Sequence, residues 1–243
     1  MIIDVHNHLG EDIDSTVQTP QMLLARMEAA GVDIAVVFPF NDVDPGVCFS
    51  KANDRIAKAC EEYDEFVGFC RVDPNYEERA VEEVERCIEE LGLKGVKLHP
   101  RSQSFYPDDP EAVKVVEKAA DLGVPVILHT ARGEPFSDPV RVGKLAEEVP
   151  DVQLIMAHMG KELGYDAAIE VAENYENVYL EVSLVKDPKV IEKTAERVGD
   201  DRIIFGSDSP YGSPSVQLEI VKEADVNHDK ILEENAANIL GLR

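Results

Sequence analysis

The sequence lacks the features that mark secreted, membrane-bound and zinc-finger proteins. Its 243 residues include four cysteines, and none of them forms a CxxC pair, so neither a disulfide framework nor a zinc-finger spacing is indicated. No apolar run approaches the roughly 20 residues of a membrane span, and no basic segment precedes a signal-like apolar stretch. We therefore expect a cytoplasmic protein with reduced thiols.

Positive charge is also scarce. Lys and Arg number 24 against 49 Asp and Glu, which gives a formal net charge of -25. Such a surface repels phosphate backbones and anionic lipid headgroups, so nucleic acid and membranes are not expected as partners. We expect a small-molecule substrate instead, and the composition leaves open whether the chain forms a homo-oligomer.

Linkers, low-complexity tracts and close internal repeats are missing as well, so we predict a single domain over residues 1–243. Short apolar runs alternate with longer charged amphipathic segments, which is the pattern of βα units around a parallel sheet. Eight such units in about 250 residues predict an α/β fold, the (βα)8 TIM barrel. Segment 229–242 is expected to form an extra C-terminal helix that packs outside the barrel or closes its base. The predicted strands are 2–5, 34–38, 66–72, 95–98, 125–128, 153–157, 178–182 and 202–205.

Histidine is rare, yet its placement is the strongest functional signal. Five of the six histidines lie at the C-terminal ends of predicted strands, where TIM barrels place their active sites. His6 and His8 are two residues apart on one strand, so both imidazoles are expected on the same face. Together with the carboxylate of Asp208, this set predicts a divalent metal site that suits zinc and tolerates manganese, iron or cobalt. The other three histidines of the set are His99, His129 and His158.

Six segments carry a family resemblance: DVHNHLG at 4–10, LKGVKLHPR at 93–101, VILHT at 126–130, LIMAHMG at 154–160, IIFGSDSPYG at 203–212 and KILEENAANILGL at 230–242. Together they resemble the amidohydrolase superfamily, and more narrowly its branch of aminocarboxymuconate semialdehyde decarboxylase-like enzymes. The resemblance implies a metal-dependent hydrolase or carboxy-lyase. It implies that His158 is an acid/base group or, in two-metal members, a second ligand. The implied metal ligands are His6, His8, His129 and Asp208, of which Asp208 also handles protons.

The fourth predicted strand decides how many metals the site holds. Lys97 and His99 occupy alternate positions there, where two-metal relatives carry a carboxylated lysine or a glutamate as a bridge. Lys97 is interpreted as such a bridge, as a cation that holds substrate, or as a buried ammonium partnered by Glu181 or Ser183. We predict a single metal, because carboxylation requires a neutral amine and His99 would crowd the bridging position.

Two reactions are open from the sequence. Metal-activated water would hydrolyse an amide, lactone or ester, whereas the same cation would absorb the charge released when a small carboxylic acid loses carbon dioxide. Arg71, Arg101 and Arg132 lie at or after the ends of strands 3, 4 and 5 and are candidates for binding a substrate carboxylate. The alternatives are a TatD-type nuclease, a histidinol-phosphatase-type phosphoesterase and a non-catalytic metal-binding barrel. The net charge and the KLHP end of strand 4 argue against the nuclease.

Overall fold

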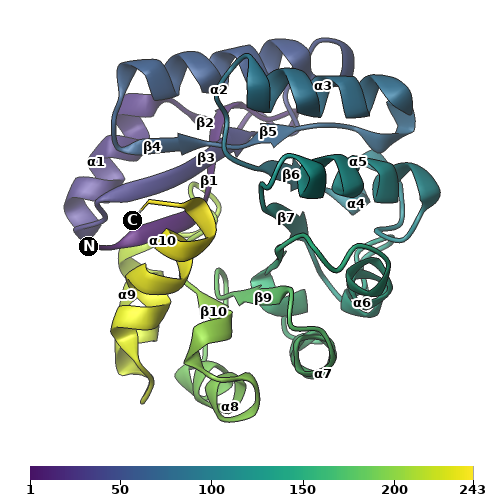
Figure 1. Cartoon of the computed structure of the whole chain (residues 1–243). Coiled ribbons are helices and arrows are strands. Elements are labelled where there is room, and N and C mark those ends of the chain that lie inside the picture. The colour runs from purple at the N-terminus through teal and green to yellow at the C-terminus, as the bar shows by residue number, and fades with distance from the viewer. Residues whose placement is uncertain (243) are drawn as a thin grey trace.

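The predicted barrel of strands enclosed by helices is present. The computed structural model describes residues 1–242 (Figure 1). β4 and β5 are two pieces of one barrel strand, separated at Phe69, so the ring has eight strands and the fold prediction is confirmed. A short β2 (Val17–Gln18) pairs antiparallel with the end of β1 and is not part of the ring. The pieces of the ring are β1 (Ile3–Glu11), β3 (Ile34–Pro39), β4 (Phe66–Gly68), β5 (Cys70–Arg71), β6 (Val96–Leu98), β7 (Val126–His129), β8 (Leu154–Ala157), β9 (Val178–Glu181) and β10 (Ile203–Ile204).

Backbone hydrogen bonds run around the ring. Parallel pairing joins β1, β3 and β4 in one sheet, and β5 to β10 in chain order in the other. At the break between β4 and β5, Phe69 N donates to Val37 O at 2.9 Å. Val5 N donates to Phe205 O at 3.1 Å, which joins the segment after β10 to β1. The two sheets therefore form one barrel.

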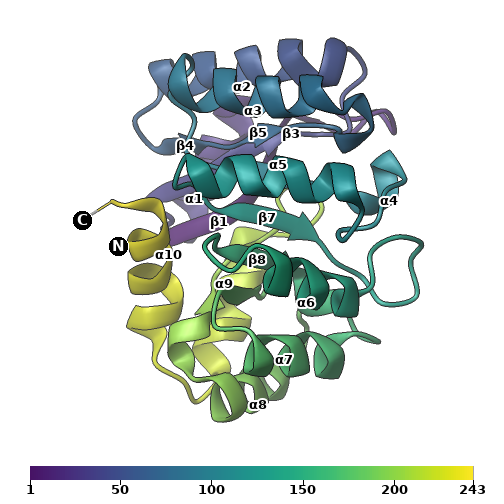
Figure 2. The ribbon, with the colours of Figure 1, turned by 45° about the vertical axis from the view of Figure 1, so that its right-hand side comes forward.

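The helices of the βα units surround the ring (Figures 1 and 2). Five of them begin with proline in the first turn, where its missing N–H is not needed. The side chains of Thr19, Asp138 and Asp187 accept hydrogen bonds from N–H groups of the first turn and cap three of these helices. Within residues 1–242, no helix combines the length and apolar character that crossing a bilayer requires. The outer helices are α1 (Pro20–Ala30), α2 (Ser50–Glu62), α3 (Glu78–Glu89), α5 (Pro110–Asp121), α6 (Pro139–Glu148), α7 (Tyr165–Asn174), α8 (Pro188–Val198) and α9 (Pro214–Glu223).

Short helical segments lie in the connections between these elements. Most of them follow a strand at the end of the barrel where the strands terminate, which is the end that we call the mouth. They are η1 (Val47–Phe49), η2 (Pro74–Tyr76), α4 (Pro100–Gln103) and η3 (His158–Gly160) at the mouth, and η4 (Asp200–Arg202) before β10.

The C-terminal segment closes the opposite end of the barrel, which we call the base. A π-helical turn η5 (Lys230–Glu234) leads into α10 (Asn235–Leu240), which lies next to the N-terminal end of β1 in both views (Figures 1 and 2). Of the two expected positions for this helix, closing the base is the one observed. The helix shares an apolar cluster with the strand interiors, formed by Ile3, Val5, Val36, Phe38, Phe69, Ile127, Ile155, Ala157, Ile204, Ala236, Ala237 and Ile239.

A bulge in β1 brings the first two histidines into the barrel. The pairing of β1 with β3 shifts register between Asp4 and Asn7. Val5 belongs to the interior cluster, and His6 and His8 line the cavity above it, although strict alternation would send Val5 and His6 to opposite faces. The carboxylate of Asp4 accepts a hydrogen bond from His6 N at 3.1 Å within the bulge. Asp4 therefore holds the backbone of this segment.

Candidate metal centre

The predicted site residues meet at the mouth of the barrel. A cavity of about 300 Å³ opens there, a volume suited to a small molecule. Arg132 does not line this cavity, and its Nε lies 3.8 Å from Asp138 Oδ2 instead. The other nine candidates line it: His6, His8, Arg71, Lys97, His99, Arg101, His129, His158 and Asp208.

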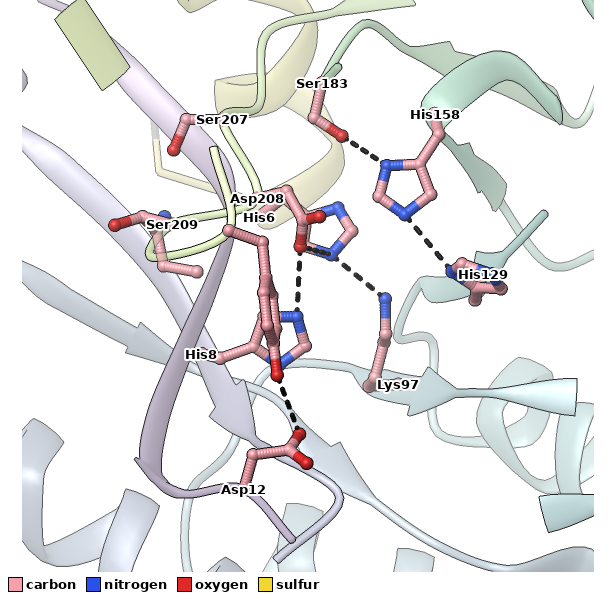
Figure 3. A network of polar contacts seen from close by, with 12 residues as sticks. His6, His8, Asp12, Lys97, His129, His158, Ser183, Ser207, Asp208 and Ser209 are labelled. Atoms are coloured by element: carbon pink, nitrogen blue, oxygen red, sulfur yellow. Dashed lines mark hydrogen bonds and ion pairs between the residues drawn. The ribbon is translucent and has the colours of Figure 1, made fainter. Parts of the chain in front are cut away.

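Three of these side chains form a compact group of metal-binding atoms. One ligand atom each from His6, His158 and Asp208 lies within 4.8 Å of the other two, and all three residues are buried. His8 adjoins the group, because His6 Nε2 and His8 Nε2 each lie 3.2 Å from Asp208 Oδ1 (Figure 3). His129 contacts the group through His158, because its Nδ1 lies 3.2 Å from His158 Nε2. Imidazole nitrogens around a carboxylate are a donor set that suits zinc and manganese, so the residues fit a divalent cation.

The backbone at two of these residues adopts an unusual conformation. His158 has a φ of 63° and Asp208 a φ of 60°, which is the left-handed region that residues other than glycine rarely occupy. Such conformations persist where the surrounding structure holds them, and they cluster at functional sites. His158 directly follows β8 and Asp208 lies four residues after the end of β10, and both direct their side chains toward the group (Figure 3).

Glu181, the last residue of β9, orients two of the histidines. Its Oε2 lies 3.0 Å from His6 Nδ1 and accepts hydrogen bonds from Ser183 Oγ at 2.7 Å and His158 N at 3.1 Å. Ser183 Oγ in turn lies 2.7 Å from His158 Nδ1. Because both Nδ1 atoms are engaged, the Nε2 atoms face the metal group. Burial raises the pKa of Glu181 to about 8, whereas these hydrogen bonds oppose the rise.

Burial keeps the site histidines neutral. It lowers the pKa of His6 and His158 well below the ordinary value and the pKa of His129 to about 4. The pKa of His8 is lowered for the same reason, although the hydrogen bond to Asp208 opposes the shift. A neutral imidazole is the form that binds a metal, so the site needs no loss of protons from these rings.

Lys97 lies beside the metal group. Its Nζ is 3.2 Å from His6 Nε2, so its contact is with a histidine and not with Glu181, the partner considered from the sequence. Burial lowers the pKa of Lys97 to about 7, which makes the neutral amine accessible. The neighbouring His99 stacks on His129, with ring centroids 4.0 Å apart.

An ion-pair network that the sequence did not predict lies at the rim of the cavity. The carboxylate of Glu134 lies 3.1 Å from His129 Nε2, 3.2 Å from Arg101 Nη1 and 2.8 Å from Lys161 Nζ. The hydrogen bond with His129 is the largest cause that holds the pKa of Glu134 below its ordinary value. No sequence signal distinguished Glu134, because one loop glutamate among 49 acidic residues carries no pattern.

Comparison with known proteins agrees with this geometry. Residues 3–242 match the family model described as amidohydrolase. The chain therefore belongs to the amidohydrolase family and is an enzyme of that type, as the motifs predicted. The comparisons do not favour the nuclease or the non-catalytic barrel.

Curated relatives are distant in sequence. The 2-amino-3-carboxymuconate-6-semialdehyde decarboxylase of Dictyostelium discoideum is 23% identical, over 95% of this chain and 79% of the relative. The gamma-resorcylate decarboxylase of Rhizobium sp. (strain MTP-10005) is also 23% identical, over 66% of this chain and 65% of the relative. The chain thus spans just under two thirds of the second relative.

Solved structures share the fold over the whole chain. The crystal structure of a 2,6-dihydroxybenzoate decarboxylase with 2,6-dihydroxybenzoate has a TM-score of 0.81 at 18% identity, covering 99% of this chain and 98% of that one. Dihydroxybenzoic acid decarboxylase from Polaromonas sp. JS666, with bound manganese and the inhibitor 2-nitroresorcinol, has a TM-score of 0.77 at 19% identity, covering 99% and 97%. At these identities the likeness establishes the barrel fold.

Proposed function

We propose that this enzyme removes carbon dioxide from a small carboxylic acid with the help of one divalent cation. The observation that carries the proposal is the buried group of His6, His158 and Asp208 in a small cavity that Arg71 and Lys97 also line. A cavity lined by these two basic side chains favours an anionic substrate over a neutral amide or ester. The relatives and neighbours named as decarboxylases support the same reaction.

The cation is proposed to bind His6, His8, His129 and Asp208. Zinc is the preferred metal for this donor set, and manganese is the main alternative because a structural neighbour holds it. A bound divalent cation would polarise a substrate oxygen and stabilise the negative charge that develops during the reaction. Glu181 supports the ligand set by holding His6 Nδ1, which leaves Nε2 available.

His158 is proposed to move the proton. When the carbon–carbon bond breaks, carbon dioxide leaves and the electron pair remains on the substrate carbon, which then takes up a proton. The Nε2 atom of His158 faces the cavity while Ser183 holds its Nδ1 at 2.7 Å, so the ring is oriented for this transfer. An anionic substrate beside the ring favours its protonated form. In a hydrolytic reaction, Asp208 would accept the proton of the attacking water.

The roles of His129 and His158 are separable by metal analysis. Their rings contact each other through His129 Nδ1 and His158 Nε2 at 3.2 Å, so either ring is near enough to serve the cation. We expect His129→Ala to lose metal, and His158→Ala to keep about one metal per chain while turnover is abolished. If His158→Ala loses the metal and His129→Ala retains it, the two roles are exchanged.

The number of metals depends on Lys97. We propose one metal per chain, because a pair of metals about 3.5–4 Å apart needs a bridge that this site offers only through a carboxylated Lys97. The lowered pKa of Lys97 makes that alternative chemically accessible and therefore worth testing. Elemental analysis is expected to give one metal per chain in both the unmodified protein and Lys97→Ala. Two metals, with one lost in Lys97→Ala, would contradict the proposal.

The reaction itself is tested with a panel of small molecules. Hydroxybenzoates and enol carboxylates are incubated with the zinc- or manganese-loaded protein, in parallel with lactones and esters. We expect carbon dioxide release from at least one carboxylic acid, with uptake of one solvent deuterium at the reacting carbon detected by NMR. Turnover of lactones or esters without carbon dioxide release would establish hydrolysis instead.

A further inference from the structure

The cavity contains a buried arginine to which the proposed reaction assigns no specific contact. Arg71, the last residue of β5, lines the cavity and is 1% exposed. Among residues 1–242, no carboxylate oxygen lies within 4.0 Å of its guanidinium nitrogens, and its Nε has no hydrogen-bond partner. The carboxylates of Asp12, Asp73 and Asp42 act on this charge only from beyond 4.0 Å. A buried charge with no carboxylate in contact is costly, so this arginine is suited to bind an anion that the protein itself does not provide.

The guanidinium is held in place before any ligand binds. Its Nη2 donates to Ser102 Oγ at 2.6 Å and its Nη1 to Pro39 O at 3.5 Å, and the group lies 4.8 Å from the centre of the Phe49 ring. Asn53 fixes the backbone, since its Oδ1 accepts from Arg71 N at 2.9 Å and its Nδ2 donates to Arg71 O at 3.0 Å. Nε and the remaining N–H groups are left for a ligand, at little further cost in ordering.

Burial combined with the lack of a carboxylate partner sets Arg71 apart from the other arginines of residues 1–242. Arg55 pairs with Asp42 at 2.7 Å, and Arg141 pairs with Asp108 at 2.9 Å. Acidic partners are abundant, because the chain has 49 Asp and Glu. Within the described part of the chain, Arg71 is nevertheless the one arginine in the buried class. The fold thus leaves unpaired the arginine for which pairing would matter most.

The cavity lining holds four basic side chains (Arg71, Lys97, Arg101 and Lys161) and two acidic ones (Asp12 and Asp208), although the protein is strongly negative. Arg71 and Lys97 line it, and among residues 1–242 neither has a carboxylate within 4.0 Å. The carboxylates that line it are Asp12 and Asp208, and Asp208 is assigned to the cation. A divalent cation would add further positive charge. This field favours a ligand with more than one negative charge.

We propose that Arg71 binds a second carboxylate of the substrate, which the reaction does not remove, so that the substrate is a small dicarboxylic acid. The planar guanidinium, with Nε free, matches a carboxylate through two parallel hydrogen bonds. β5 lies opposite β9 in the ring, with three strands between them in either direction, and Glu181 of β9 adjoins the metal group. Arg71 and the metal group therefore hold the two ends of the substrate. That the other carboxylate of the substrate is the one removed rests on the proposed function, whereas the binding of a carboxylate by Arg71 does not.

The test compares a dicarboxylate with a monocarboxylate by calorimetric titration. The probes are benzene-1,3-dicarboxylate and benzoate, and the proteins are the unmodified chain, Arg71→Met, Arg71→Lys and the control Arg132→Met, whose arginine is half exposed and lies outside the cavity. Each titration is made with metal and again with chelator. We expect Arg71→Met to reduce the preference for the dicarboxylate in the metal-loaded protein by about 10- to 100-fold, the usual effect of losing hydrogen bonds to a charged group.

The variants also separate binding from a structural role. In Arg71→Lys the point charge remains but the paired hydrogen bonds are lost, so we expect an intermediate loss of preference. Arg132→Met is expected to bind like the unmodified chain. Arg71→Met is expected to unfold at the same temperature or higher, because it removes an unpaired buried charge. If it does not fold, Arg71→Lys carries the test.

Three results would overturn the inference. The first is an unchanged dicarboxylate preference in a folded Arg71→Met or, where only Arg71→Lys folds, in that variant. The second is dicarboxylate binding to the unmodified chain no tighter than benzoate binding. The third is tighter, Arg71-dependent binding of inorganic phosphate, which would indicate a phosphate ester. Arg71-dependent dicarboxylate binding in chelator, without turnover of any carboxylic acid, would refute the proposed function and leave this inference standing.

Discussion

At the base of the barrel the interior is apolar and covered by α10, whereas at the mouth, a few residues farther along the same strands, it is polar and charged. In β7, Ile127 belongs to the apolar cluster and His129 lines the cavity. The same change occurs between Ile155 of β8 and His158, which directly follows that strand. The base gains stability from apolar burial, while the mouth buries charges and neutral imidazoles at a cost in stability. The residues that stabilise the fold thus lie at the base of the barrel, and the residues of the metal centre lie at its mouth.

The largest expected effect is at the mouth. In the double variant His6→Ala/His8→Ala, two imidazoles are removed from the metal group, so we expect bound metal and turnover to fall below detection. The free energy of unfolding of the metal-free protein should change little by comparison. Elemental analysis and denaturant unfolding in chelator measure the two quantities. Retention of stoichiometric metal in this variant would contradict the placement of the metal centre at the mouth.

The next effect is at the base. Phe69 is 1% exposed, packs within the interior cluster and lies directly over Gly95. Phe69→Ala should lower the free energy of unfolding by about 3–5 kcal/mol, because a large buried side chain leaves a cavity. Urea unfolding of the metal-free protein measures the loss. Metal stoichiometry in the folded variant should stay unchanged. A loss of bound metal would show that packing at the base affects the metal centre at the mouth.

A smaller effect is expected from the residue that orients the ligands. In Glu181→Gln the shape of the side chain is kept, but one of the two oxygens that hold His6 Nδ1, His158 N and Ser183 becomes an amide NH2, so metal affinity should fall about 10- to 100-fold. Competition with a fluorescent chelator measures the affinity. The matched control is Glu170→Gln, on the exposed face of α7, which should bind metal like the unmodified chain. Equal affinities in the two variants would remove Glu181 from the metal centre.

The smallest expected effect comes from removing a single methyl group at the base. Ile155 is 1% exposed, and Ile155→Val should lower the free energy of unfolding by about 0.5–1.5 kcal/mol with no effect on metal affinity. The same unfolding and competition measurements apply. A clear change in metal affinity would show that packing at the base reaches the metal group.

The fold was predictable because each strand and helix carries a local pattern. Apolar runs separated by amphipathic segments located all eight barrel strands, and the histidines marked the strand ends. The bulge in β1 was not predictable, because alternation alone places Val5 and His6 on opposite faces and only the pairing with β3 shows otherwise. For the segment 229–242, apolar spacing indicated a helix, but the π-helical turn before α10 depends on packing at the base.

The site was predictable in its residues more than in its contacts. Strand ends in a parallel barrel meet at one edge, so the histidines and Asp208 converge by topology. Partners are set by distances across the barrel, which no single strand reveals. Glu181 therefore contacts His6 instead of Lys97, and Glu134 reaches the site from a loop. Burial without a carboxylate in contact, which distinguishes Arg71 from Arg132, is likewise visible only in the folded chain.

Anomalous diffraction from crystals of the metal-loaded protein tests the central claim most directly, namely that the polar mouth is a metal centre. Data collected at the absorption edges of zinc and manganese locate each bound ion without reference to activity. We predict one strong peak at the mouth, within bonding distance of His6, His8 and Asp208. Peaks confined to surface carboxylates, or no peak between these three side chains, would contradict the account.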